Sequence, residues 1–102
     1  MIQTIADALA KQGYESLTPV QEAVTDPALT DADLLVSAQT GSGKTVAFGL
    51  AIAPTLLGDR DKFGHAGAPL ALIIAPTREL AMQVSRELTW LYSEAGAVVT
   101  TC

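Results

Sequence analysis

The chain has 102 residues, of which 49% are hydrophobic and 17% charged, so it can bury the core of one small domain and is not a disordered tail. Six basic against eleven acidic side chains give a net charge of −5, which argues against binding to nucleic acid or an anionic membrane through bulk positive charge. Because Cys102 is the only cysteine and no apolar run approaches the roughly eighteen residues of a membrane span, we expect a cytoplasmic domain without disulfides or membrane contact.

Two short helices are predicted at the start of the chain. Apolar residues at helical spacing, followed by Gly13, predict an amphipathic helix over residues 3–12. Thr18 then suits the N-cap of a second helix and Pro19 suits its first turn. Gln21 stands three residues after Thr18, which is the spacing of a capping box.

Three apolar segments predict buried strands, at residues 34–38, 70–75 and 97–101. Helices are expected between them, so the alternation predicts an α/β fold with a parallel sheet and helical crossovers. About three strands make a thin sheet for this architecture. We therefore expect residues 1–102 to be the N-terminal portion of one larger domain.

The helices between these strands are predicted at residues 44–57 and after Pro76-Thr77, with Gly96 as the end of the second one. Residues 58–69 have no periodicity and predict a loop. His65 in this loop is expected to be solvated, and the aromatic residues Trp90 and Tyr92 to pack. The buried face of the second helix is expected to consist of Leu80, Val84, Leu88, Leu91 and Ala95.

The segment from Ala38 to Thr45 is the strongest functional signal, because it matches the phosphate-binding pattern G-x-x-x-x-G-K-[ST] except for Ala38. Gly41 and Gly43 allow a tight turn whose N–H groups point at phosphate oxygens, and the positive end of the following helix faces the same anion. Lys44 supplies a full positive charge for the β- and γ-phosphates, and the Thr45 hydroxyl can ligate Mg²⁺. The predicted nucleotide-binding residues are Ala38, Gln39, Thr40, Gly41, Ser42, Gly43, Lys44 and Thr45, of which Lys44 and Thr45 are also the predicted catalytic residues.

Two further places in the chain have both a structural and a functional interpretation. Gln21 suits the capping box, but its amide can also accept from the amino group of adenine and donate to the neighbouring ring nitrogen, a pattern that guanine does not offer. Thr77 suits a helix N-cap followed by a solvated Arg78, but a hydroxyl and a guanidinium at a helix N-terminus also suit a phosphodiester oxygen. The residues alone leave both pairs of alternatives open.

Three segments resemble motifs of the DEAD-box RNA helicases. Residues 13–21, Gly-Tyr-Glu-Ser-Leu-Thr-Pro-Val-Gln, resemble the Q motif; residues 38–45 match motif I, A-x-T-G-x-G-K-T; and residues 76–81 are identical to motif Ia, P-T-R-E-L-A. The resemblance implies the first part of a RecA-like P-loop NTPase domain of an ATP-dependent RNA helicase, with ATP and Mg²⁺ as its cofactors. It also explains why an alanine stands at the start of the phosphate-binding pattern.

The resemblance gives roles to the residues with two interpretations. It implies that Gln21 recognises adenine and that Pro76, Thr77 and Arg78 contact the RNA backbone, without reading the base sequence. It also implies that the intact protein couples ATP binding and hydrolysis to local unwinding of RNA duplexes. The Asp-Glu-Ala-Asp motif and the second domain of the family are expected after Cys102, so the chain alone is expected to be inactive as an enzyme.

Two other functions stay open at this stage. A different P-loop ATPase, or a small-molecule kinase, would bind a nucleotide without a glutamine that selects adenine. A non-catalytic interaction fragment would use the fold as a scaffold. The uncovered strand edge expected at residues 97–101 favours pairing with another chain, so a homodimer through this edge is a further expectation.

Overall fold

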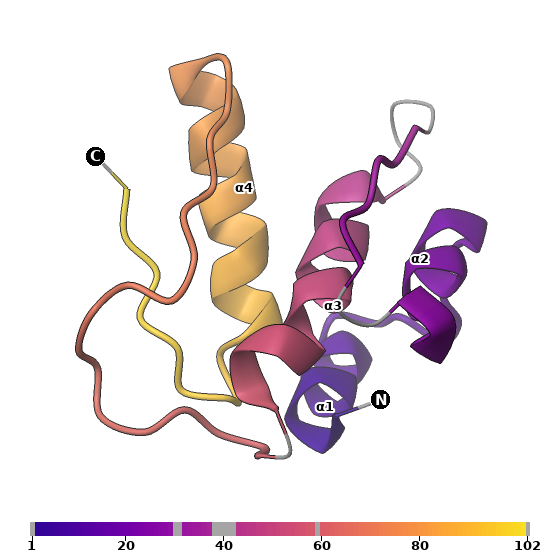
Figure 1. Ribbon diagram of the computed structural model, residues 1–102, viewed down its shortest axis with the longest axis horizontal. Coiled ribbons are helices and arrows are strands. Elements are labelled where there is room, and N and C mark those ends of the chain that lie inside the picture. Colours follow the sequence, from indigo (N-terminus) through magenta and orange to yellow (C-terminus); the bar gives the residue numbers. More distant parts are fainter. Residues whose placement is uncertain (1, 30–31, 38–42, 59, 102) are drawn as a thin grey trace.

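The computed structural model of the protein describes residues 2–29, 32–37, 43–58 and 60–101. These ranges contain four α-helices and one short 3₁₀ helix, η1 (Figure 1). In chain order the elements are α1 (Gln3–Lys11), α2 (Pro19–Val24), η1 (Pro27–Leu29), α3 (Lys44–Leu57) and α4 (Arg78–Leu91). The four predicted helices are therefore confirmed, whereas η1 is an element that the sequence did not predict.

Helix α3 is the centre of the packing. It contacts α2 on one side and α4 on the other, and α1 packs against α4. Figure 1 shows that α3 and α4 run in the same direction, with both helices beginning at the top of the view. Their facing sides form the core together with α1, and its buried members are Ile5, Leu9, Val46, Leu50, Ala53, Leu57, Val84, Leu88, Leu91, Tyr92 and Ala95.

The start of α2 is fixed by the predicted capping box. The Thr18 hydroxyl accepts a hydrogen bond from the backbone N–H of Gln21 at 3.4 Å, and the Gln21 side-chain oxygen accepts one from the N–H of Thr18 at 3.0 Å. Pro19 occupies the first turn, where its missing N–H costs nothing. Both halves of the box are therefore present, and they hold Gln21 in one place.

Helix α3 approaches α4 closely at Gly49. A Cβ atom at this position would lie 2.6 Å from Cδ2 of Leu91 and 3.0 Å from Cδ2 of Leu88. These distances are shorter than van der Waals contact, and both leucines are buried, so they have little room to move. The absence of a side chain at Gly49 is what allows the two helices to lie this near to each other.

Helix α4 begins as predicted and ends earlier than predicted. The Thr77 hydroxyl accepts from the N–H of Leu80 at 3.2 Å and caps the helix. The last helical residue is Leu91, and the chain then makes a series of turns up to Gly96, which has a φ of 76°. Ala95 is fully buried in these turns, whereas Leu80 is 37% exposed because it lies at the end of α4 that extends beyond the packed core.

None of the described residues is in a strand, so the predicted parallel sheet is not confirmed. The described parts of the segments 34–38, 70–75 and 97–101 run without regular secondary structure. A strand needs a partner for its backbone groups, and the described parts of these segments are not paired with one another. Their apolar side chains are consequently exposed, in particular Leu35, Leu70, Leu72, Ile74 and Val98. Within the described ranges, no helix has the length and apolar character that crossing a membrane requires.

Candidate functional site

The start of α3 carries the described part of the predicted phosphate-binding segment. Gly43 is the N-cap of the helix, Lys44 and Thr45 are its first two residues, and the Lys44 side chain is exposed. Thr45 is partly exposed. The other predicted ligands of this segment, residues 38–42, lie outside the described residues.

A hydrogen bond joins Gln21 to this helix start. The side-chain nitrogen of Gln21 donates to the carbonyl oxygen of Gly43 at 3.3 Å, across 22 positions of sequence. The same carbonyl accepts the first helical hydrogen bond, from the N–H of Ala47 at 2.9 Å. Gln21 is fully buried, so its amide forms a bridge between the cap of α2 and the cap of α3. The family resemblance implied that Gln21 and the phosphate-binding segment belong to one site, and the structure brings Gln21 and Gly43 into contact.

Position 43 requires glycine for two independent reasons. Its φ is 84°, in the left-handed region that residues with a side chain rarely adopt. A Cβ atom there would also collide with the side-chain nitrogen of Gln21. Any other residue would therefore strain the turn and displace the Gln21 amide.

The first turn of α3 fits a phosphate group. At the start of α2 and of α4, a threonine side chain accepts a hydrogen bond from a backbone N–H group of the first turn. The N-cap of α3 is a glycine, which has no side chain that could accept one. Within the described ranges, no side chain accepts from the first N–H groups of α3, which carry the positive end of the helix dipole. With the exposed Lys44 beside them, they form a set of donors and positive charge that suits a polyphosphate.

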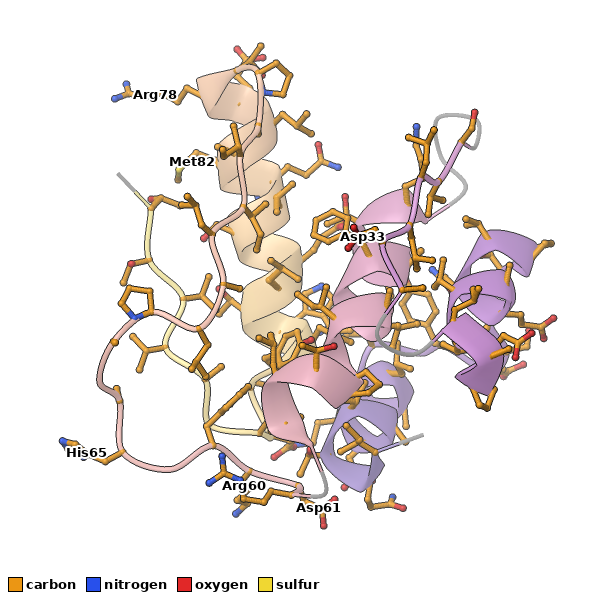
Figure 2. All side chains as sticks on the ribbon, viewed as in Figure 1. Asp33, Arg60, Asp61, His65, Arg78 and Met82 are labelled. Carbon is orange, nitrogen blue, oxygen red and sulfur yellow. The ribbon has the colours of Figure 1, made fainter. Side chains whose placement is uncertain are left out.

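The predicted RNA-binding residues lie at the start of α4, at the same end of the structure as the start of α3 (Figure 1). Pro76, Thr77 and Arg78 are all exposed. Figure 2 shows that Arg78 extends away from the rest of the molecule. In the described part of the chain the ion pair is between Lys11 and Glu94, so Arg78 is not held by a carboxylate there. The capping role of Thr77 is confirmed, and its contact with RNA stays a prediction.

A second buried polar contact, which the sequence did not predict, joins α3 to the end of α4. The Tyr92 hydroxyl donates to the carbonyl oxygen of Gly49 at 2.6 Å. Burial raises the pKa of Tyr92 above its usual range, so the hydroxyl remains a donor at neutral pH. The sequence indicates that Tyr92 packs, and a glycine inside a helix is a signal of close packing. No local sequence pattern, however, pairs two residues that lie 43 positions apart.

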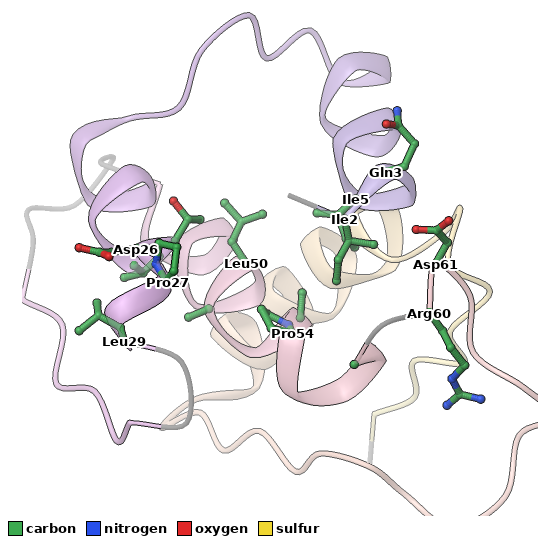
Figure 3. A pocket seen from close by; sticks show the side chains of 15 residues that line it. Ile2, Gln3, Ile5, Asp26, Pro27, Leu29, Leu50, Pro54, Arg60 and Asp61 are labelled. Atoms are coloured by element: carbon green, nitrogen blue, oxygen red, sulfur yellow. The ribbon is translucent and has the colours of Figure 1, made fainter.

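A groove of about 580 Å³ lies on another side of the molecule. It is lined by residues of α1, η1 and the second half of α3, and by Arg60 and Asp61. Figure 3 shows Leu50 and Pro54 of α3 between the side chains from α1 and those from η1. Neither Gln21 nor Gly43 lines it. The groove is therefore separate from the candidate nucleotide site.

Comparisons with known proteins agree on one family. A family model described as DEAD/DEAH box helicase matches residues 18–102. The chain is 48% identical over 98 residues to DEAD-box ATP-dependent RNA helicase 53 of Oryza sativa subsp. japonica, a match that covers 96% of this chain and 16% of the rice protein. It is 45% identical over 83 residues to the mitochondrial DEAD-box ATP-dependent RNA helicase 9 of Arabidopsis thaliana, covering 81% of this chain and 14% of that protein. The chain thus spans a small part of the length of these relatives.

A solved structure supports the same conclusion about the fold. The RNA helicase Prp28 from Chaetomium thermophilum, in a crystal structure with ADP, is similar with a TM-score of 0.81 and 35% sequence identity. The likeness covers 98% of this chain and 24% of the Prp28 chain. The arrangement of the helices is therefore that of a RecA-like fold.

Proposed function

Because the chain belongs to the DEAD/DEAH box helicase family, we propose that it forms the part of an ATP-dependent RNA helicase that binds ATP and the RNA backbone. The main support is the family match itself, which includes the starts of both α3 and α4. Residues 1–102 are then the N-terminal portion of one ATP-binding domain, consistent with the 16% of the rice relative that they match. In the intact protein, ATP binding and hydrolysis drive local unwinding of RNA duplexes.

Gly43, Lys44 and Thr45 are proposed to hold the phosphates of ATP together with residues 38–42. The first turn of α3, which lacks a side-chain cap, supports this role, and so does the exposed ammonium group of Lys44. The Thr45 hydroxyl is the proposed ligand of Mg²⁺. When bound, ATP and Mg²⁺ supply the phosphoryl group and the charge neutralisation that phosphoryl transfer requires.

Gln21 is proposed to recognise the adenine base. Its amide is already placed at the N-cap of α3, where a nucleotide on the phosphate-binding segment would lie nearby. Both ends of the amide are engaged, with the N–H of Thr18 and with the carbonyl of Gly43. The amide oxygen has a second lone pair and the amide nitrogen a second hydrogen that a base could use, but Gln21 is fully buried, so contact with a base requires its neighbours to move.

A Gln21→Glu variant tests this assignment with little change in side-chain size. The carboxylate can still accept from the N–H of Thr18, but it cannot donate to the adenine ring nitrogen or to Gly43. We expect the ratio of ATP affinity to GTP affinity, measured by calorimetry, to fall about tenfold. Gln12→Glu adds the same charge at an exposed position and should leave the ratio unchanged. An equal preference for ATP and GTP in the unaltered chain would instead favour a different P-loop enzyme.

The RNA backbone is proposed to bind at Pro76, Thr77 and Arg78. The support is that the Arg78 guanidinium is exposed at a helix N-terminus, and that the Thr77 hydroxyl still has its own hydrogen to donate while it caps the helix. With a net charge of −5, contact with RNA must come from a few placed groups. Such contacts hold the sugar–phosphate chain and do not distinguish base sequences.

The finer features of the fold are also proposals. We propose that residues 34–38, 70–75 and 97–101 are the strands of a parallel sheet in the RecA-like fold, as their apolar composition and their place between helices suggest. In the chain by itself these segments expose Leu72, Ile74 and Val98, which are 84%, 85% and 72% accessible. Exposed apolar segments with unpaired backbone groups favour association of two copies.

Light scattering tests this association. We expect the chain to be a dimer at micromolar concentration, and Ile74→Lys to shift it toward the monomer because a charge opposes burial of this segment. Lys62→Glu changes the charge of an exposed loop residue and should leave the mass unchanged. A monomer at all concentrations would exclude the proposed homodimer.

A further inference from the structure

A buried tyrosine joins the end of α4 to the middle of α3. Tyr92 is 4% exposed, and its hydroxyl donates to the carbonyl oxygen of Gly49 at 2.6 Å. A carbonyl oxygen has two lone pairs, so Gly49 can accept this hydrogen bond in addition to a helical one. Because the contact is shielded from water, the hydrogen bond is stronger than an exposed one, and breaking it would leave a buried hydroxyl without a partner.

The surrounding packing makes this a point of fixed alignment between the two helices. Leu88 and Leu91 fill the space that a side chain at Gly49 would occupy, so the helices meet there with no intervening layer. The Tyr92 ring is held by Phe63, with the two ring centroids 6.1 Å apart. A rotation of α3 or a shift along α4 would distort the hydrogen bond between Tyr92 and Gly49, so this contact opposes both movements.

The hydrogen bond between Tyr92 and Gly49 lies between the helix that carries the proposed nucleotide site and the helix that carries Arg78. Gly49 lies on the same helix as Lys44, about 8 Å along the axis by the rise of an α-helix. Tyr92 directly follows α4, whose other end carries Arg78. A displacement of the start of α3 that moved the helix as a unit would also move Gly49, and with it the hydrogen bond to Tyr92 at the end of α4.

We propose that Tyr92 is a positioning residue that transmits nucleotide binding from the start of α3 to α4 through its hydrogen bond with Gly49. The inference rests on the proposed nucleotide site and adds that the helix with the RNA-facing residues responds when this site is filled. Tyr92 contacts neither the nucleotide nor RNA and acts only through the backbone of α3.

Trp90 provides a built-in reporter for the test. It is the only tryptophan of the chain and lies on α4 two residues before Tyr92, with its ring stacked on that of Tyr14 at a centroid distance of 5.8 Å. Tryptophan fluorescence, excited where neither tyrosine nor nucleotide absorbs, is followed while the full chain is titrated with unlabelled ATP and Mg²⁺. Calorimetry on the same samples measures binding independently of the fluorescence.

The comparison is between the unaltered chain, Tyr92→Phe and Tyr14→Phe. Tyr92→Phe keeps the ring and removes only the oxygen that binds Gly49, so we expect ATP affinity to change by no more than about twofold while the Trp90 response falls to about half or less. Tyr14→Phe removes the same atom from the ring that stacks on Trp90, and it should keep the full response. This control shows whether the loss of a tyrosine hydroxyl near Trp90 changes its fluorescence directly.

Each other outcome counts against the inference. A full Trp90 response in Tyr92→Phe would show that the hydrogen bond is not the route of transmission. ATP binding without a Trp90 response in the unaltered chain would overturn the inference and leave the nucleotide site standing. If the unaltered chain binds no ATP by calorimetry, the proposed function fails for the chain, and the role of Tyr92 fails with it.

Discussion

A Gly49→Val variant is expected to lose about 3 kcal/mol or more of its free energy of unfolding. The first added carbon alone would lie 2.6 Å from Cδ2 of Leu91, which is fully buried and has no free space to enter. The two further methyl groups would push α4 away from α3 and break the hydrogen bond from Tyr92. Because small domains are stable by only about 5–15 kcal/mol, such a loss would be a large fraction of the total stability. Urea denaturation followed by circular dichroism measures it.

Thr55→Val on the same helix is the matched control. Thr55 is exposed, and the substitution exchanges one β-branched side chain for another, so we expect a change within about 0.5 kcal/mol. If Gly49→Val unfolds at the same urea concentration as the unaltered chain, α3 and α4 do not approach each other at Gly49 as described. A loss in both variants would instead indicate that α3 tolerates no change at all.

A Lys44→Ala variant is expected to lose ATP affinity by about 100-fold, because the ammonium group makes charge-assisted hydrogen bonds with phosphate oxygens that alanine cannot make. Lys44 is exposed at the first position of α3, so its loss should leave the free energy of unfolding nearly unchanged. Calorimetric titration with ATP and Mg²⁺ measures the affinity, and urea denaturation of the same variant confirms that the fold is intact.

Lys62→Ala removes the same charge from an exposed loop and should bind ATP as the unaltered chain does. An equal loss of ATP affinity in both variants would show that Lys44 contributes only its positive charge and no specific contact with the phosphates.

The chain alone is also expected to release no phosphate from ATP above the blank. Phosphate release that Lys44→Ala abolishes would contradict this expectation, whereas release that persists in the variant would indicate a contaminating enzyme.

The helices were predictable because their signals are local. Thr18 and Gln21 satisfy the first N–H groups of α2 from within one turn, and Thr77 does the same for α4. Such contacts are encoded by spacing alone, so the sequence located both helix starts. The end of α4 was less predictable, because the turns between Leu91 and Gly96 continue the helical rotation with different hydrogen bonds.

The contacts that assemble the site could not be read from local patterns. Residue types and a family resemblance selected Gln21 and Gly43, but the hydrogen bond between them depends on how α2 packs against α3. The pairing of Tyr92 with Gly49 likewise depends on tertiary packing between two helices. Periodicity specifies which side of a helix is apolar and leaves open which partner it meets.

The predicted strands show that strand-like composition alone does not form a strand. Runs such as Leu70 to Ala75 have the composition of buried strands, yet Leu72 and Ile74 are largely exposed in the structure. Strand composition is a preference for a pleated, covered surface, and that surface exists only when neighbouring strands supply it. The sequence thus predicts what these segments favour, while their pairing depends on the rest of the fold.

The parallel course of α3 and α4 has a consequence for the response of the molecule to salt. Their positive ends lie at one edge of the structure, although the chain as a whole is acidic. Two polyanions at that edge would share a local positive potential and would also repel each other over a distance comparable with the Debye length. Raising the ionic strength should therefore weaken the attraction of each one separately, while relieving the mutual repulsion when both are present.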